Sequence, residues 1–148
     1  MKDLFGPRFR LLHWGTDQIM NDALAQMDLT ASQGRIMGYL ARQSNPPCAH
    51  DIEAHFHLSH PSVSGTLSRM EKKGFIETRA DDQDHRCKRI YILPKGLECH
   101  ERMMQVIRNI EQQITNDFTE SDRASFSALL DRAIHNMGIH CCPPKKEE

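Results

Sequence analysis

Apolar residues in the first part of the chain recur at steps of three and four positions. From Phe5 to Met27 this spacing predicts an amphipathic helix with a period of about 3.6 residues. The capping-box pattern from Thr30 to Gln33 predicts the start of a second helix, which is expected to run to about Arg42. The turn formers at 44–47 end it, and a short third helix is expected from about 49 to 56.

A fourth helix is predicted after a second break in the pattern. Pro61 suits the first turn of a helix because the N–H that it lacks is unpaired there in any case, and Ser59 or His60 can cap it. Gly74 is expected to end this helix in a left-handed conformation. Three apolar residues fall on the face predicted to be buried: Val63, Leu67 and Met70.

The period changes beyond this helix. Residues 75–79 and 88–93 predict two strands, joined by a polar hairpin tip at 80–87. A long fifth helix is expected to open at Pro94 and to keep an apolar face as far as Phe118, and a sixth is expected from 119 to 137. The fold class is therefore mainly α with a small β-hairpin, and its middle part follows the plan of a winged helix-turn-helix module that binds DNA.

The first and last helices have wide apolar faces that one small module cannot cover. Self-association through the two ends of the chain is therefore expected. The chain is interpreted as a single domain, 1–148, with a DNA-binding lobe at about 30–96 and dimerisation helices at about 5–28 and 97–139. Six residues are expected at or near the interface: Phe9, Leu12, Ile19, Phe126, Leu130 and Ile134.

Composition narrows the class of protein. With 39% hydrophobic and 26% charged residues, the chain is typical of a globular protein, and no apolar run approaches the roughly 18 residues that span a bilayer. The formal net charge of −1 excludes a uniformly basic surface and leaves room for a local basic patch. The amino terminus shows no signal peptide, and the five cysteines are an odd number without CxxC pairs. We therefore expect a cytoplasmic protein with reduced thiols.

The sequence resembles the MarR family of bacterial transcription regulators over about Arg8 to Met137. The resemblance rests on four groups of residues: Leu29-Thr30 with Gln33; Pro61-Ser62-Val63-Ser64 with Leu67; Glu71-Lys72-Lys73-Gly74-Phe75-Ile76; and Arg79 with Asp84, Arg86, Leu93 and Gly96. Two positions depart from the family pattern. Pro94 stands where Thr is usual, although it suits a first turn, and Gly65 lowers the helix propensity of the expected recognition helix.

The proposed DNA contacts lie on the fourth helix and the hairpin. Small hydroxyls and an arginine allow a helix to lie deep in a major groove, and an arginine on a narrow loop can enter the minor groove. Asp84 is expected to hold an arginine side chain, and Asp81 and Asp82 to keep the loop solvated. The candidate DNA-binding residues are Ser62, Ser64, Thr66, Ser68, Arg69, Arg79, Asp84, His85 and Arg86, with Lys88 and Arg89 as further cations of the hairpin.

The resemblance also implies how such a protein works. It implies a homodimer, most often a repressor, on a palindromic double-stranded operator, with no cofactor and no membrane partner. A small, lipophilic or phenolic effector would bind between the dimerisation helices and the DNA-binding lobe and release the DNA. The candidate pocket residues are His13, Trp14, Asp17, Arg35, Met37, Tyr39 and Met104.

Three alternatives remain. A winged helix can bind another protein instead of DNA. A metal- or thiol-responsive switch on the same fold would use the histidines at 55, 57 and 60, the cluster from His135 to Cys142, or Cys99; solvated histidines and buried or incidental thiols are favoured, and no metal site is expected. An enzyme finds no support, because no phosphate-binding loop, Gly-x-Ser-x-Gly or His-Glu-x-x-His is present.

Overall fold

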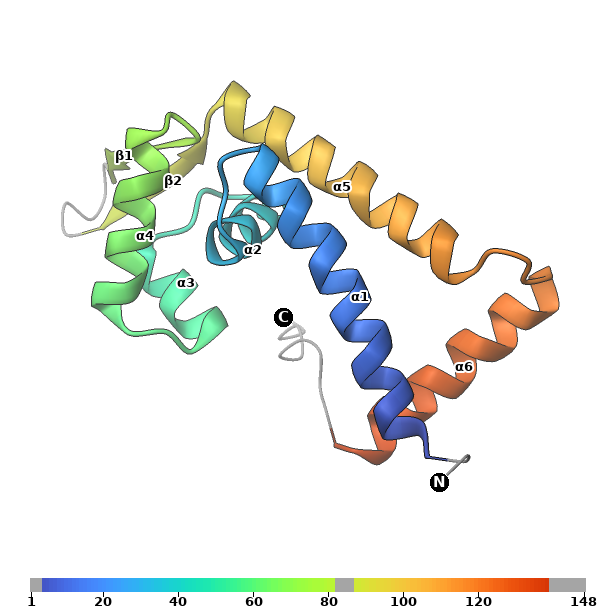
Figure 1. Cartoon of the computed structure of the whole chain (residues 1–148). Helices are drawn as coiled ribbons and strands as arrows, with labels where there is room; N and C mark the ends of the chain where they lie inside the picture. Colours follow the sequence, from blue (N-terminus) through green and yellow to red (C-terminus); the bar gives the residue numbers. More distant parts are fainter. Residues whose placement is uncertain (1–3, 82–86, 139–148) are drawn as a thin grey trace. The chain divides into compact units, whose positions relative to one another are not determined.

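A computed structural model describes residues 4–81 and 87–138. Within them the helices and strands follow the predicted order, as Figure 1 shows. Their bounds are α1 Phe5–Gln26, α2 Ala31–Leu40, α3 Ala49–Phe56, α4 His60–Lys72, β1 Ile76–Ala80, β2 Lys88–Ile92, α5 Pro94–Ile114 and α6 Glu120–Asn136. The chain forms two compact units, the first ending at Ile110 and the second beginning at Glu111, and each is described by itself.

The starts of α2 and α3 follow from local hydrogen bonds. The Gln33 N–H donates to Thr30 Oγ1 at 3.3 Å and the Thr30 N–H donates to Gln33 Oε1 at 3.0 Å, which confirms the predicted capping box. At the start of α3 the Cys48 N–H donates to Asp51 Oδ2 at 2.8 Å. Both helices therefore begin where side chains satisfy backbone N–H groups that no helical carbonyl can reach.

The hairpin is a two-stranded antiparallel sheet that pairs Ile76 with Ile92 and Ala80 with Lys88. Gly74 ends α4 at φ +75°, the left-handed conformation expected of it. The α5 helix starts close beneath the sheet, since a Cβ added to Gly96 would lie 2.3 Å from the Phe75 carbonyl oxygen. Only glycine allows this approach, and it joins the hairpin rigidly to the first turns of α5.

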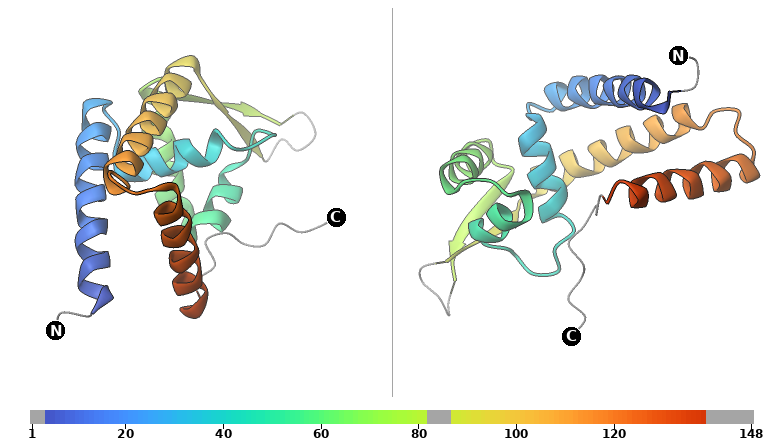
Figure 2. Two further views of the ribbon diagram at one scale, coloured as in Figure 1. Left: turned by 90° about the vertical axis from the view of Figure 1, so that its right-hand side faces the viewer. Right: turned by 90° about the horizontal axis from the view of Figure 1, so that it is seen from below.

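The core of the first unit lies between α2, α3, α4 and the hairpin. Ile52, Val63, Met70 and Phe75 are completely buried there. They come from α3, α4 and the chain just before β1, so one set of apolar contacts holds α4 and the hairpin in place. The two views of Figure 2 show these elements gathered together. The predicted buried face of Val63, Leu67 and Met70 is confirmed.

The second unit contains a correction at the end of α5. This helix ends at Ile114, and Asp117 then takes a left-handed φ of +63°. Phe118 therefore does not continue the apolar face of α5, as predicted, but packs edge-on against Phe126 with ring centroids 5.6 Å apart. The α6 helix starts at a capping box, in which the Thr119 N–H and hydroxyl both donate to Asp122 Oδ2.

Large apolar side chains remain exposed on α1. Trp14 is 61% exposed and Leu11 68%, and Phe5, Phe9, Leu12 and Ile19 are also exposed. The carboxyl-terminal part of α1 contributes to the core, through the buried Leu24 and the partly buried Met20 and Ala23. In the described part of α6 no residue is buried. Within the described ranges, no helix has the length and apolarity needed to cross a bilayer.

Candidate nucleic-acid interface

The α4 helix presents one polar face to solvent. Ser62, Ser64, Ser68 and Arg69 are exposed on it. Their hydroxyls and guanidinium provide donors and acceptors of the kinds that contact base edges and phosphates. The helix runs without a break through Gly65, so the low helix propensity of glycine does not interrupt it.

Thr66 does not belong to this face, and the prediction that it is exposed was wrong. It is 9% exposed, and its hydroxyl donates to the Ser62 carbonyl oxygen at 2.9 Å. Thr66 lies three residues after Val63 and four before Met70, both of which face the core. A helix places residues at these spacings on the same side, so Thr66 is turned inward with them.

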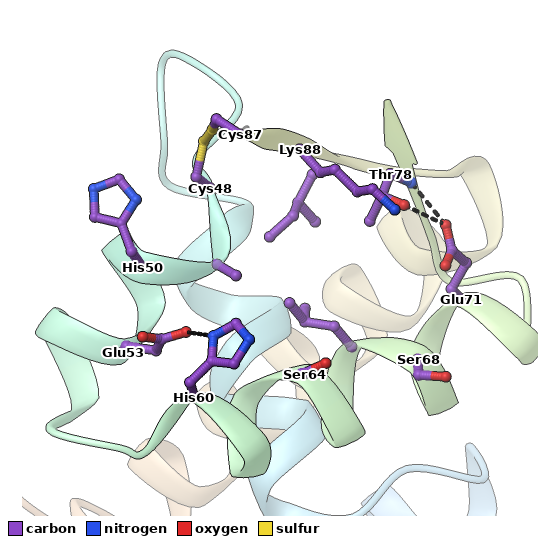
Figure 3. A pocket seen from close by; sticks show the side chains of 13 residues that line it. Cys48, His50, Glu53, His60, Ser64, Ser68, Glu71, Thr78, Cys87 and Lys88 are labelled. Carbon is purple, nitrogen blue, oxygen red and sulfur yellow. Dashed lines mark hydrogen bonds and ion pairs between the residues drawn. A yellow bond between two sulfur atoms is a disulfide. The ribbon is translucent and has the colours of Figure 1, made fainter. Parts of the chain in front are cut away.

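A carboxylate joins α4 to the hairpin. Glu71 Oε1 accepts the Thr78 N–H at 2.8 Å and the Thr78 hydroxyl at 2.9 Å (Figure 3). This contact positions β1 relative to the exposed face of α4. Sequence reasoning missed it, because a helix residue and a strand residue seven positions apart form no recognisable local pattern.

Two arginines that pair near the loop end of the hairpin have intramolecular partners. Arg79 pairs with Glu77, and its guanidinium carbon lies 4.7 Å from the centre of the Tyr91 ring. Arg89 pairs with Asp81 and donates to the Pro46 carbonyl oxygen at 3.2 Å. The hydrogen bond with Asp81 raises the pKa of Arg89 further above its ordinary value. Both arginines are therefore held in defined orientations.

The prediction that Asp81 only keeps the loop solvated was also wrong. Its carboxylate is 11% exposed and paired, so it does not simply keep the loop solvated. Asp81 holds the Arg89 side chain, a contact of the kind that was predicted for Asp84. Asp84 itself lies outside the described residues, as do Asp82, His85 and Arg86.

A groove of about 500 Å³ lies between α3, α4 and the hairpin (Figure 3). His50 and Glu53 line it from α3, and Glu53 Oε1 is 2.6 Å from Nδ1 of His60, the first residue of α4. Ser64 and Ser68 of the polar face line it from α4, and Lys88 lines it from β2. The groove therefore borders the surface that carries the predicted DNA contacts.

A disulfide joins Cys48 to Cys87 at one end of this groove, so the prediction of reduced thiols throughout was wrong. Their Cα atoms lie 6.2 Å apart, although 39 positions separate them in sequence. The segment before α3 forms an isolated antiparallel bridge with β2 between Cys48 and Arg89, and the Ile90 N–H donates to the Pro47 carbonyl oxygen at 2.9 Å. These backbone contacts, invisible in the spacing of the cysteines, bring the two residues together.

The residues predicted to line an effector pocket are spread over several places. On α1, Trp14 is exposed and His13 pairs with Asp17 at 3.2 Å. Arg35 is exposed beside a small cavity near Phe56. Met37 and Tyr39 are buried, and Met104 is partly buried on α5. The groove of Figure 3 is lined by none of these seven residues.

The histidines at 55, 57 and 60 have separate environments. The His55 ring packs at a tilt against Tyr39 with centroids 4.5 Å apart, His57 takes a left-handed φ of +52° at the end of α3, and His60 pairs with Glu53. Of the cluster proposed between His135 and Cys142, only His135 lies within the described residues, on α6.

Comparison with known proteins agrees with this arrangement. Residues 27–86, which include α2 to α4 and the first strand of the hairpin, match the model of the MarR family. The structure of MepR from S. aureus bound to DNA is similar, with a TM-score of 0.73 and 27% sequence identity over 87% of this chain and 96% of that one. Over residues 27–86 the chain is therefore similar to the MarR family.

Other transcription regulators are similar to this chain over most of their length. The HTH-type transcriptional repressor IacR of Pseudomonas putida is 23% identical over 85% of this chain and 75% of its own. The homoprotocatechuate degradative operon repressor of Escherichia coli is 29% identical over 72% of each chain. A second structure of MepR, described as a transcription regulator of the Staphylococcus aureus multidrug efflux pump MepA, has a TM-score of 0.79 and 26% identity over 90% of this chain and 98% of that one.

The predicted winged helix-turn-helix fold is thereby confirmed. The proteins that the chain resembles are transcription regulators, and one of them, MepR, is solved in complex with DNA. The DNA contacts of single residues stay predictions, carried by the exposed face of α4 and the adjoining hairpin.

Proposed function

We propose that the protein is a homodimer that represses transcription from a two-fold symmetric operator and is released from it by a small molecule. The observation that carries the proposal is the polar face of α4, where Ser62, Ser64, Ser68 and Arg69 are exposed next to a hairpin that Glu71 holds in place. This face would enter the major groove, and the hairpin would follow the phosphates toward the minor groove.

A second copy of the chain is the partner we assign to the outer helices. Phe9, Leu12 and Ile19 recur on one face of α1, and all three are exposed in a single chain. Phe126, Leu130 and Ile134 recur in the same way on α6, where none is buried. Exposed apolar faces of this length are typical of surfaces that a partner covers, and a two-fold dimer would present two α4 helices to successive major grooves.

Repression is supported by the names of two relatives, the P. putida and E. coli repressors. The E. coli relative is named for an operon that degrades homoprotocatechuate, an aromatic acid, which supports an aromatic acid as the effector class. A relative from Rhodopseudomonas palustris, 25% identical over 74% of this chain and 64% of its own, is named a transcriptional activatory protein, so the direction of control needs a test.

The recognition face is tested by Arg69→Ala, with Arg108→Ala as the matched control. Arg108 is an exposed arginine of α5 whose guanidinium donates to Gln105 on the same helix. After the operator is obtained by selection from random duplexes, Arg69→Ala should weaken operator binding by roughly 1–3 kcal/mol and relax the base preference. Arg108→Ala should change neither. Equal losses for both variants, or none for Arg69→Ala, would remove α4 as the reading helix.

A substitution in the hairpin should change DNA binding in a different way from Arg69→Ala. Arg86→Ala should weaken operator and scrambled duplex alike, because a groove or phosphate contact is insensitive to base sequence. The slope of log affinity against log salt should flatten by about one unit. Unchanged binding to both duplexes would show that this arginine does not touch DNA.

Dimeric binding predicts a protected pseudo-palindrome with half-sites roughly 10 base pairs apart, centre to centre, in a footprint. Homoprotocatechuate and simple phenolic acids, added to the protein–operator complex, should lower its affinity if they prefer the released conformation. Protection of one asymmetric half-site would contradict the dimer. Unchanged affinity with every aromatic acid would contradict the proposed effector class and leave the DNA-binding result standing.

A further inference from the structure

Metal-ligating side chains gather at the end of the groove where Cys48 and Cys87 meet. The Cys48 Sγ, a ring nitrogen of His50 and a carboxylate oxygen of Asp51 all lie within 4.8 Å of one another. The Cys87 Sγ is bonded to the Cys48 Sγ, so it lies next to this cluster. One sulfur, one nitrogen and one oxygen therefore lie close together at the start of α3, and a second sulfur reaches the first from the residue before β2.

Backbone contacts hold this cluster together without the disulfide. The Ile90 N–H donates to the Pro47 carbonyl oxygen, and the bridge between Cys48 and Arg89 fixes the segment before α3 against β2. Cys48 is 4% exposed at the junction. After the sulfur–sulfur bond is reduced, these contacts would keep the two thiols near each other, so a pre-arranged pair of ligands would be left.

His50 and Asp51 can each offer an atom to the same point. Asp51 uses Oδ2 to accept the Cys48 N–H, which leaves Oδ1, and Oδ1 is 3.1 Å from His50 Nε2. The His50 side chain is largely exposed, so the ring can turn toward the sulfurs at little cost. The hydrogen bond to the Cys48 N–H orients the carboxylate in the way that outer hydrogen bonds orient metal ligands.

We propose that the reduced protein binds one zinc-class divalent cation through Cys48, Cys87, His50 and Asp51. Two thiolates, one imidazole and one carboxylate suit the tetrahedral preference of Zn²⁺. Binding forms two metal–sulfur bonds and releases one proton from each thiol to the solvent, and no electron is transferred in this step. The disulfide form has no thiolate to offer and does not bind the cation.

The site becomes available by thiol–disulfide exchange with a small dithiol. The dithiol supplies two electrons and two protons, becomes a disulfide itself, and leaves two free thiols on the protein. The oxidised and the metal-bound forms therefore exclude each other, and each ties the start of α3 to the hairpin by a different bond.

Metal titration of the full chain tests the site. The protein is first reduced with a dithiol, and a chelator then removes any bound metal. The dithiol and the chelator are removed under anaerobic conditions, and the protein is titrated with Co²⁺. One equivalent per chain should give the thiolate-to-cobalt charge-transfer band and the intense visible bands of tetrahedral cobalt, and Zn²⁺ should abolish them. The untreated disulfide form should give neither band.

Variants separate this cluster from the other cysteines. Cys87→Ser and His50→Gln should weaken zinc binding by more than the roughly 10–100-fold that loss of an outer-shell partner costs. His50 is exposed, so His50→Gln keeps the test valid even where a cysteine variant folds poorly. Cys99→Ser is the matched control, because this thiol is buried apart from the cluster and burial raises its pKa. A chain with both Cys141→Ser and Cys142→Ser should also bind normally.

Absence of the charge-transfer band in the reduced protein would overturn the proposal. So would its survival in Cys87→Ser, or its loss in the variant without Cys141 and Cys142, which would place the metal at the carboxyl terminus. The readout is metal uptake without DNA, so it is independent of the proposed function. A failed operator experiment leaves it unaffected, and a failed titration leaves the operator experiment unaffected.

Discussion

Two regions of the molecule differ in how their apolar faces are covered. One is the region from α2 to the hairpin, and the other consists of the outer helices α1 and α6. In the first region the apolar face of each element meets another apolar face of the same chain, and Ile52, Val63 and Met70 are completely buried. On most of α1 and on all of α6 the apolar residues recur just as regularly, yet they stay exposed or only partly covered. Periodicity alone therefore predicts a helix, whereas a core needs a partner surface.

The largest effect is expected from a charge on the apolar face of α6. Leu130→Asp should abolish the dimer, because the substitution would bury an unpaired carboxylate at the interface. Ala128→Asp is the matched control on the opposite face of the same helix and should leave the dimer intact. Light scattering measures the mass of both. A stable Leu130→Asp dimer would exclude α6 from the interface.

A truncation in the inner core should lower the free energy of unfolding more than truncation of an exposed apolar residue on α1. Ile52→Ala should lower the free energy of unfolding by about 2–5 kcal/mol, since Ile52 is completely buried. Leu11→Ala removes a comparable side chain that is largely exposed and lies away from the Phe9 and Leu12 face, so it should change stability little. Urea unfolding of both variants checks the contrast, and similar losses would refute it.

Two glycines give a smaller and more specific comparison. Gly96→Ala should destabilise the protein by roughly 1–3 kcal/mol, because the new Cβ would press on a backbone carbonyl that has no room to move. Gly38→Ala should instead stabilise it by about 0.5–1 kcal/mol, since a Cβ there meets no atom within 4 Å and alanine favours the helix. The two melting temperatures should therefore shift in opposite directions.

The smallest effect is expected at the cap of α6. Hydrogen bonds from Thr119 hold the pKa of Asp122 below its usual range. The folded pKa is thus lower than the unfolded one, so the contribution to stability is present above the unfolded pKa and is lost as pH falls through the folded pKa. Thr119→Ala should reduce helicity at neutral pH and differ less from the parent in acid, measured by circular dichroism. A gap that widens in acid would contradict this.

Local patterns were sufficient for the elements of this fold. Thr30 and Gln33 set the start of α2, Gly74 ends α4, and the alternation around Ile76 and Ile90 predicts the strands, because each signal acts within a few residues. The winged helix-turn-helix order, and with it the α4 face of Ser62, Ser64, Ser68 and Arg69, followed from these elements and from the family resemblance.

Only the tertiary structure decided which side chains meet across elements. Thr66 is buried because α4 packs against the core on the side that carries it. Asp81 pairs with Arg89 across the hairpin. The Glu71 bridge to Thr78 and the junction of Cys48 with Cys87 depend on how α4, the start of α3 and β2 pack together. The sequence by itself determined the order of the helices and strands and where capped helices begin, since capping and periodicity are local, but it did not determine where α5 ends. The meeting of Cys48, His50, Asp51 and Cys87 required the fold, because a separation of 39 residues closes only when the core brings its ends together.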